Sequence, residues 1–151
     1  IPTNDESYLS TLVRKIDEVS SDYEIMICGL PTWDGFETVD QALLKKLNTH
    51  IFNGIYLDYT NTNVLNFRQK FITNYHNDPM APVFQAFDLI THLTSNYEKF
   101  GYDFDKYISK PTIEAPVGGF RFERVGENAG WENRNLSILK YADYKYTRIN
   151  K

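Results

Sequence analysis

The sequence has a single cysteine and no long apolar run. Cys28 stands in the short apolar run 25–28, so neither an internal disulfide nor a metal site of several cysteines is possible, and we expect a buried thiol. The apolar runs are far too short to cross a bilayer, and no basic segment followed by an apolar one opens the chain. The chain begins at Ile1 without an initiator Met, so we expect a piece of a longer protein whose targeting segment lies upstream.

An excess of positive charge is also lacking. The 151 residues include 16 Lys and Arg against 20 Asp and Glu, which gives a net charge of -4. No run of Lys and Arg forms a face that could neutralise phosphates. The composition therefore argues against a nucleic-acid partner, and the length fits one domain with a core of its own.

Catalytic signatures are absent as well. The sequence has no nucleophile elbow, P-loop, dinucleotide-binding fingerprint or zinc-protease motif. Its three histidines lie on different predicted elements without a second ligand at metal spacing, and its paired carboxylates fit turn and cap roles better than acid and base chemistry. We therefore predict no enzyme, no metal site and no cofactor. The histidines are His50, His76 and His92, and the carboxylate pairs are Asp34 with Glu37 and Asp103 with Asp105.

The first part of the chain predicts alternating helices and strands. Residues 5–21 carry apolar side chains at helical spacing, and Asn4 or Asp5 is placed to cap the first free amides. The apolar run 24–28 is too short for a helix and favours a strand covered on both faces. Apolar residues between 39 and 47 indicate a second helix, and residues 54–58 then predict a second strand.

The pattern continues with two further helices and a tail of β-formers. Residues 64–75 and the segment from Pro82 to Gly101 predict helices, and a short helix is possible within 102–111. Helices alternating with covered strands imply right-handed crossovers and a parallel sheet. In the tail, 120–125 and 136–141 predict an antiparallel hairpin around a loop at 126–133, and a last strand is expected at 144–149.

These elements predict an α/β fold, a three-layer parallel sheet with flanking helices plus a C-terminal antiparallel β-hairpin. We treat residues 1–151 as a portion of one domain, in which 1–76 form mostly one lobe and 77–151 form a return segment and the β tail. No internal repeat, low-complexity segment or long linker divides the chain.

Position on such a sheet predicts where a ligand would bind. Ligands of open parallel sheets gather outside the carboxyl ends of the strands, where the following helices also point their free amides. Three loops meet that description, and their hydroxyls, amides and rings suit a small polar solute. The alternative is that Thr3, Asn4, Asp34 and Thr62 only cap helices. Capping explains Trp33 less easily. The three loops are residues 2–6, residues 31–34 and residues 59–61.

Several motifs resemble those of a known family. Gly29-Leu30-Pro31-Thr32-Trp33 follows a predicted strand, Tyr59 follows the next, and Phe87-Asp88 lies on a helix. Their order resembles the second half of the type I periplasmic binding proteins, the Leu/Ile/Val-binding and receptor ligand-binding group, over nearly the whole chain. The tail resembles binding-protein-like domains of Bacteroidetes, some of which carry an upstream LysM module, through Phe120-Arg121-Phe122, Gly130-Trp131-Glu132-Asn133 and Tyr141-Ala142-Asp143-Tyr144.

This resemblance implies a periplasmic or otherwise exported protein that holds a ligand between two lobes closing about a hinge. The ligand-binding positions that match the family are Thr3, Asn4, Asp5, Thr32, Trp33, Tyr59 and Phe84, and Asp88 has a structural role. The first strands of the family fold are missing. Their loss would expose edges and apolar faces, so we expect a homodimer, the missing N-terminal half, or a remnant of a longer protein cut in a loop.

Two functions remain open at this point. The first is a non-catalytic domain of the bacterial envelope that binds an amino acid, a peptide or a cell-wall fragment, as in transport, and shifts between open and closed states. The second is an envelope scaffold or regulator that keeps the fold without a ligand and holds a protein partner on its aromatic surface. The 11 Tyr, 10 Phe and 2 Trp are compatible with either function.

Overall fold

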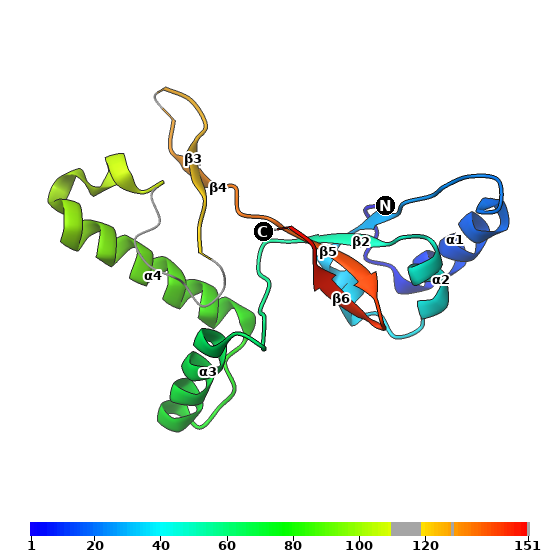
Figure 1. Ribbon diagram of the computed structural model, residues 1–151, viewed down its shortest axis with the longest axis horizontal. Helices are drawn as coiled ribbons and strands as arrows, with labels where there is room; N and C mark the ends of the chain where they lie inside the picture. Colours follow the sequence, from blue (N-terminus) through cyan, green and yellow to red (C-terminus); the bar gives the residue numbers. More distant parts are fainter. Residues whose placement is uncertain (110–118, 128, 151) are drawn as a thin grey trace. The chain divides into compact units, whose positions relative to one another are not determined.

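A computed structural model describes residues 1–109, 119–127 and 129–150. The chain forms two compact units, which are described separately (Figure 1). The first unit contains residues 1–54 and 136–151, and the second contains residues 55–135.

The first unit is built on a four-stranded mixed sheet of order β1-β2-β5-β6 (Figure 1). β1 (Cys28–Gly29) pairs in parallel with β2 (His50–Asn53), whereas β2 pairs antiparallel with β5 (Ser137–Ala142). β5 also pairs antiparallel with β6 (Lys145–Arg148). The chain is thus a mixed α/β protein, and the predicted three-layer parallel arrangement is not confirmed.

One face of this sheet carries the core of the unit. Gly29, Ile51 and Leu139 are register partners and are all buried, so they point to the same covered face. Trp33, from the 3₁₀ helix η1 (Pro31–Gly35), packs directly on Gly29. The helices α1 (Glu6–Val19) and α2 (Gln41–Lys46) add the buried side chains Leu9, Val13 and Leu44.

The second strand lies earlier in the chain than predicted. α2 ends at Lys46, Asn48 takes a left-handed conformation with φ of 48°, and β2 starts at His50. Asn tolerates this conformation better than most residues, so the turn is completed within two residues of the helix. Residues 54–58 therefore follow the strand instead of forming it, and the prediction of a strand at 54–58 was wrong.

The second unit pairs two helices with a hairpin. α3 (Thr62–Tyr75) and α4 (Ala81–Phe100) confirm the predicted helices, and α4 ends at Gly101, whose φ of 59° suits glycine. The 3₁₀ helix η2 (Gly101–Tyr107) confirms the short helix, although residues 110–111 of that prediction lie outside the described residues. β3 (Phe122–Arg124) and β4 (Trp131–Asn133) form a separate antiparallel pair.

The tail contains two hairpins, and neither is the predicted one. Residues 136–141 were expected to pair with 120–125, but β3 pairs with β4, which lies in the predicted loop. β5 pairs instead with β2 and β6, and the expected last strand is confirmed as β6. Asp143 and Tyr144 both have positive φ, as tight two-residue hairpin turns require. The partner of a strand depends on distant residues, which its own alternation does not reveal.

Candidate functional site

Two loops meet at the carboxyl end of β1. The indole Nε1 of Trp33 donates to the carbonyl oxygen of Thr3 at 2.9 Å, and the hydroxyl of Thr32 donates to Oδ1 of Asn4 at 2.7 Å. The amino group of Ile1 donates to the carbonyl oxygen of Cys28, so the segment before α1 lies beside β1. We call Thr3, Asn4, Asp5, Thr32 and Trp33 the carboxyl-end rim.

Trp33 holds the carboxyl-end rim from beneath. Its side chain is only 2% exposed, and a Cβ placed on Gly29 would lie 2.2 Å from Cε3 of the Trp33 ring. A side chain at position 29 would therefore displace the ring. The Trp33 ring fixes the position of the Thr3 carbonyl, and the solvent-exposed surface of the rim comes from other residues.

The start of α1 adds a second set of contacts to the rim. Asp5 caps the helix by accepting from the backbone N–H of Tyr8 at 2.9 Å, which confirms that the predicted cap lies at residues 4–5. Oε1 of Glu6 accepts from both the backbone N–H and the hydroxyl of Thr38. These bonds, the backbone one above all, lower the pKa of Glu6 below its usual value. The loop after η1 is thus tied to the same helix terminus.

The rim presents donors to solvent. Asn4 and Thr32 are both exposed, and within the described residues Nδ2 of Asn4 has no hydrogen-bond partner. The backbone N–H groups of Glu6 and Ser7 likewise donate to no atom in the described part of the chain. An amide donor and a free helix terminus at one edge favour the carboxylate or carbonyl oxygen of a ligand.

Tyr59 and Phe84 belong to the second unit. Tyr59 was chosen because it follows the predicted strand 54–58, but β2 ends at Asn53 and Tyr59 precedes α3. Its ring is 51% exposed, with the guanidinium of Arg68 at 5.9 Å from the ring centroid. Phe84 is fully buried, and its ring centroid lies 4.8 Å from that of Phe67.

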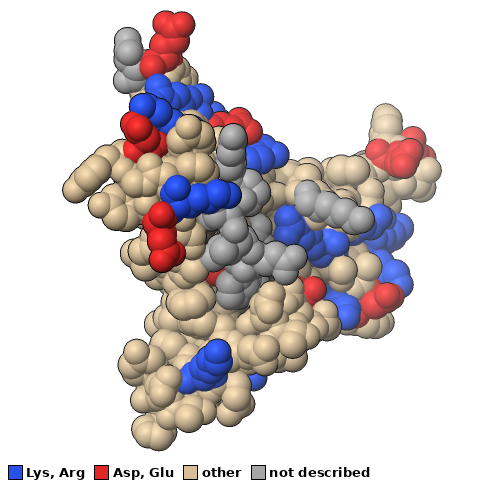
Figure 2. Space-filling view, turned by 60° about the vertical axis from the view of Figure 1, so that its left-hand side comes forward, with Lys and Arg blue, Asp and Glu red and all other residues tan. Residues whose placement is uncertain are grey.

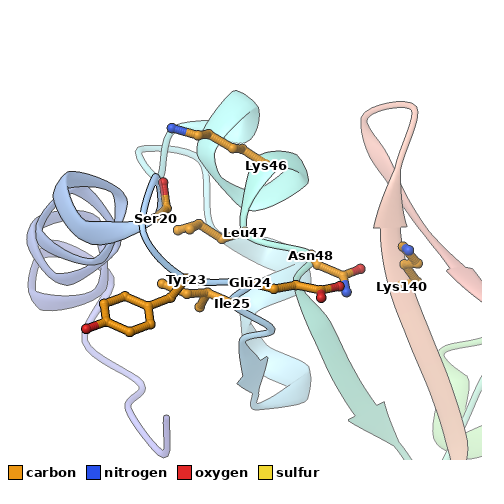
Figure 3. A pocket seen from close by; sticks show the side chains of 8 residues that line it. All are labelled: Ser20, Tyr23, Glu24, Ile25, Lys46, Leu47, Asn48 and Lys140. Carbon is orange, nitrogen blue, oxygen red and sulfur yellow. The ribbon is translucent and has the colours of Figure 1, made fainter.

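A pocket of about 360 Å³ lies at the other end of the parallel strands (Figure 3). Glu24 precedes β1 and Asn48 precedes β2, so both mark the amino ends of strands. Sequence reasoning missed this amino-end pocket, because the positional rule for ligands points only to the carboxyl ends of strands. It is lined by Ser20, Tyr23, Glu24, Ile25, Lys46, Leu47, Asn48 and Lys140.

The second unit has an aromatic groove between α3 and α4. Phe67 packs against Phe87 with ring centroids 4.5 Å apart, and Phe71 packs against Tyr75 at 4.6 Å. Together with Lys70, Asn74 and Val83 these rings line a hollow of about 440 Å³, the α3–α4 groove. The surface around α3, at the lower end of Figure 2, is mostly uncharged, whereas elsewhere on the face drawn there basic and acidic side chains are interspersed.

Three of the residues considered for catalysis, His50, His92 and Asp103, have structural partners. His50 contacts the carbonyl oxygen of Asn48 through Nδ1 at 2.7 Å, and His92 contacts that of Ile108 through Nε2 at 2.9 Å. Asp103 accepts from Lys106 at 2.5 Å. In the described ranges, no group of three or more His, Cys, Asp or Glu is arranged to hold a metal ion. None of the described helices is both long enough and apolar enough to span a bilayer.

Comparison with known proteins places the fold. No protein-family model and no curated protein matches the chain. A solved structure described as a putative branched-chain amino acid ABC transporter from Rhodospirillum rubrum is 11% identical with a TM-score of 0.54, covering 95% of this chain and 42% of that one. An ABC transporter substrate-binding protein from Desulfitobacterium hafniense is 13% identical with a TM-score of 0.51, covering 93% and 40%.

The chain shares part of the fold of ABC transporter substrate-binding proteins. It spans about two fifths of the length of these two structures. At such low identity the likeness concerns the fold alone, and function has to be argued from the site.

Proposed function

We propose that this chain is a non-catalytic part of a solute-binding protein, and that the carboxyl-end rim holds the polar end of a small solute. The shared fold supports this proposal, because its two matched structures are described as a substrate-binding protein and a transporter. The position of the rim supports it too, since ligands of α/β sheets gather at the carboxyl ends of parallel strands.

One observation carries the proposal, the pair of hydrogen bonds between the two rim loops. The Thr32 hydroxyl and the Trp33 indole join residues that are 28 and 30 positions apart in the chain. Such bonds fix the two loops relative to each other before a ligand arrives, which reduces the entropy lost on binding. If these residues only capped a helix, hydrogen bonds from a second loop would not be needed.

The rim residues have different roles in this proposal. Asn4 and Thr32 contact the ligand, because both are exposed and Asn4 keeps a free amide donor. Thr3 and Asp5 shape the helix terminus, since the Thr3 hydroxyl accepts from the backbone N–H of Asp5 at 3.1 Å. Trp33 positions Thr3 from below. Tyr59 and Phe84, in the other unit, stay predictions.

The ligand class and the location are part of the proposal. An amino acid, a peptide or a cell-wall fragment would present a carboxylate or carbonyl to the amide donors at the rim. A periplasmic or otherwise exported protein of the bacterial envelope is the setting in which such solutes are captured. Fractionation of cells that produce the full-length protein tests the location, and recovery from the cytoplasm alone would contradict it.

The test is a thermal-shift screen of the chain with amino acids and cell-wall peptides. A ligand that raises the melting temperature should lose about tenfold in affinity with Thr32→Val, because one bond of the rim is removed. Thr11→Val is the matched control, since the Thr11 hydroxyl donates only to the Ser7 carbonyl within α1. A ligand whose affinity is the same in both variants would contradict the rim assignment.

A second candidate function, binding of a partner protein, is favoured by the α3–α4 groove. Tyr75 is 68% exposed and Phe87 is 45% exposed, and exposed aromatic clusters are enriched in protein interfaces. An envelope protein whose capture survives Asn4→Ala but is lost with Phe87→Ser would favour this function. Tyr8→Ser provides a control with an exposed aromatic residue in the other unit.

A further inference from the structure

The amino-end pocket contains two opposite charges that do not neutralise each other. Glu24 and Lys140 both line the pocket, and within the described residues neither forms an ion pair or a side-chain hydrogen bond. Figure 3 shows the Glu24 and Asn48 side chains extending toward β5, the strand that carries Lys140. The other cation, Lys46, is already engaged with Asp17, the distance from Nζ to Oδ1 being 2.5 Å.

Asn48 adds an acceptor that the protein does not use. The left-handed turn explains why Asn stands here, and its backbone N–H donates to the carbonyl oxygen of Lys45 at 3.2 Å. The turn does not explain the side chain, whose Oδ1 is buried and accepts no hydrogen bond from the described residues. A buried acceptor left unpaired disfavours the folded state, so a rotation of the Asn48 side chain that pairs it with a ligand donor in the pocket would be stabilising.

We propose that the amino-end pocket binds a small zwitterion of about dipeptide size. The ligand ammonium donates to the Glu24 carboxylate and, once the Asn48 side chain rotates toward the pocket, to its Oδ1, and the ligand carboxylate accepts from the Lys140 ammonium. The apolar side chains Ile25 and Leu47 contact the chain that joins the two charges. The pocket volume, about 360 Å³, lies in the range of small-molecule sites.

This site is separate from the carboxyl-end rim. Glu24 and Asn48 precede the two parallel strands, whereas the rim follows β1, so the two sites lie at opposite ends of the same strands. Loss of one site therefore leaves the other in place, and Asn4→Ala should not change binding at the amino-end pocket. The amino-end pocket can hold its ligand whether or not the rim binds a solute.

The experiment is an NMR titration of the ¹⁵N-labelled chain with glycylglycine. We expect amide shifts confined to residues near 24–25, 47–48 and 140. Glycylglycinamide lacks the carboxylate and N-acetylglycylglycine lacks the ammonium, so each should bind at least about tenfold more weakly. Equal binding of either analogue, or shifts outside the pocket only, would overturn the proposal.

Two variants assign the charges. Glu24→Gln and Lys140→Met should each weaken glycylglycine binding by about tenfold or more, because a charge-assisted hydrogen bond is lost. Lys145→Met, an exposed lysine on the neighbouring strand β6, is the matched control and should bind as the unchanged chain does. Amide spectra of the free variants show whether each is folded. Unchanged affinity in folded Lys140→Met contradicts the site.

Discussion

The contacts that stabilise the inside of each unit differ between the two units of this chain. In the first, backbone pairing joins distant segments, such as Ile51 with Leu139, and an aliphatic core with Trp33 covers one face of the sheet. In the second, ring contacts join the neighbouring helices α3 and α4, and α4 buries the polar side chains of Asp88, His92 and Asn96. Because long-range pairing brings loops from different parts of the chain together, the first unit can form the carboxyl-end rim.

The largest effect is expected from Trp33→Ala, which would break the first unit. Removing a large buried aromatic side chain destabilises a protein by about 3–5 kcal/mol. The loss of stability should exceed that from the lost packing contacts alone, because the Thr3 carbonyl oxygen also loses its hydrogen-bond donor. Hydrogen exchange should report lost protection in β1, β2 and β5, while amides of α4 keep theirs.

Trp131→Ala is the matched control for this change. Trp131 is only half-buried on β4, with the Arg124 guanidinium 5.2 Å from its ring, so its loss should leave the sheet of the first unit protected. If Trp33→Ala reduced protection equally in α4, the two units would unfold as one and the contrast between them would be lost.

Phe84→Ala is the corresponding change in the second unit. The side chain is fully buried against Phe67, so we expect a similar loss of about 3–5 kcal/mol, but in α3 and α4. Hydrogen exchange again distinguishes the units. Phe87→Ala, at a half-exposed ring on the same helix, should cost clearly less, and an equal cost would contradict the assignment of Phe84 to the core.

A smaller and more local effect is expected from Gly29→Ala. The added Cβ would lie 2.2 Å from the Trp33 ring, so the ring has to move. Overpacking of this kind destabilises by about 1–3 kcal/mol, and urea unfolding followed by tryptophan fluorescence measures it. Gly35→Ala is the control because a Cβ there meets nothing within 4 Å. Equal stability of both variants would show that the ring does not depend on Gly29.

Local patterns predicted the helices well and the sheet only in part. The spacing of Leu9 and Val13 identifies α1, and Gly101 marks the end of α4. β2 was predicted four residues too late, since the apolar run after Gly54 has a pattern as typical of a strand as that of the true strand. The mixed sheet was not foreseen, because the antiparallel partner of His50 is Lys140, 90 positions away.

The sites divide in the same manner. The rule that ligands gather at carboxyl ends identified Thr3, Asn4, Thr32 and Trp33, which the structure brings together. It could not foresee that Trp33 is buried, because burial depends on its packing against Gly29. The amino-end pocket has no signal in the sequence, since it needs the left-handed turn before β2 and a lysine from β5.

The smallest effect is expected on the acid dependence of stability, from Glu6→Gln. Hydrogen bonds from Thr38 lower the pKa of Glu6 in the folded chain below its ordinary value. A lowered folded pKa means that this stabilisation is present above the unfolded pKa and is lost as the pH falls through the folded pKa. Urea midpoints of the first unit between about pH 6 and pH 3 should therefore fall less steeply with Glu6→Gln than in the unchanged chain.

Glu37→Gln is the control for this titration, because Glu37 is exposed beside Thr38 without a side-chain hydrogen bond in the described part of the chain. Its profile should follow that of the unchanged chain. The second unit should show no dependence on Glu6 at any pH, since all partners of this carboxylate lie in the first unit. A response of α3 and α4 to Glu6→Gln would show that acid unfolds both units together, and the contrast between them would then hold only at neutral pH.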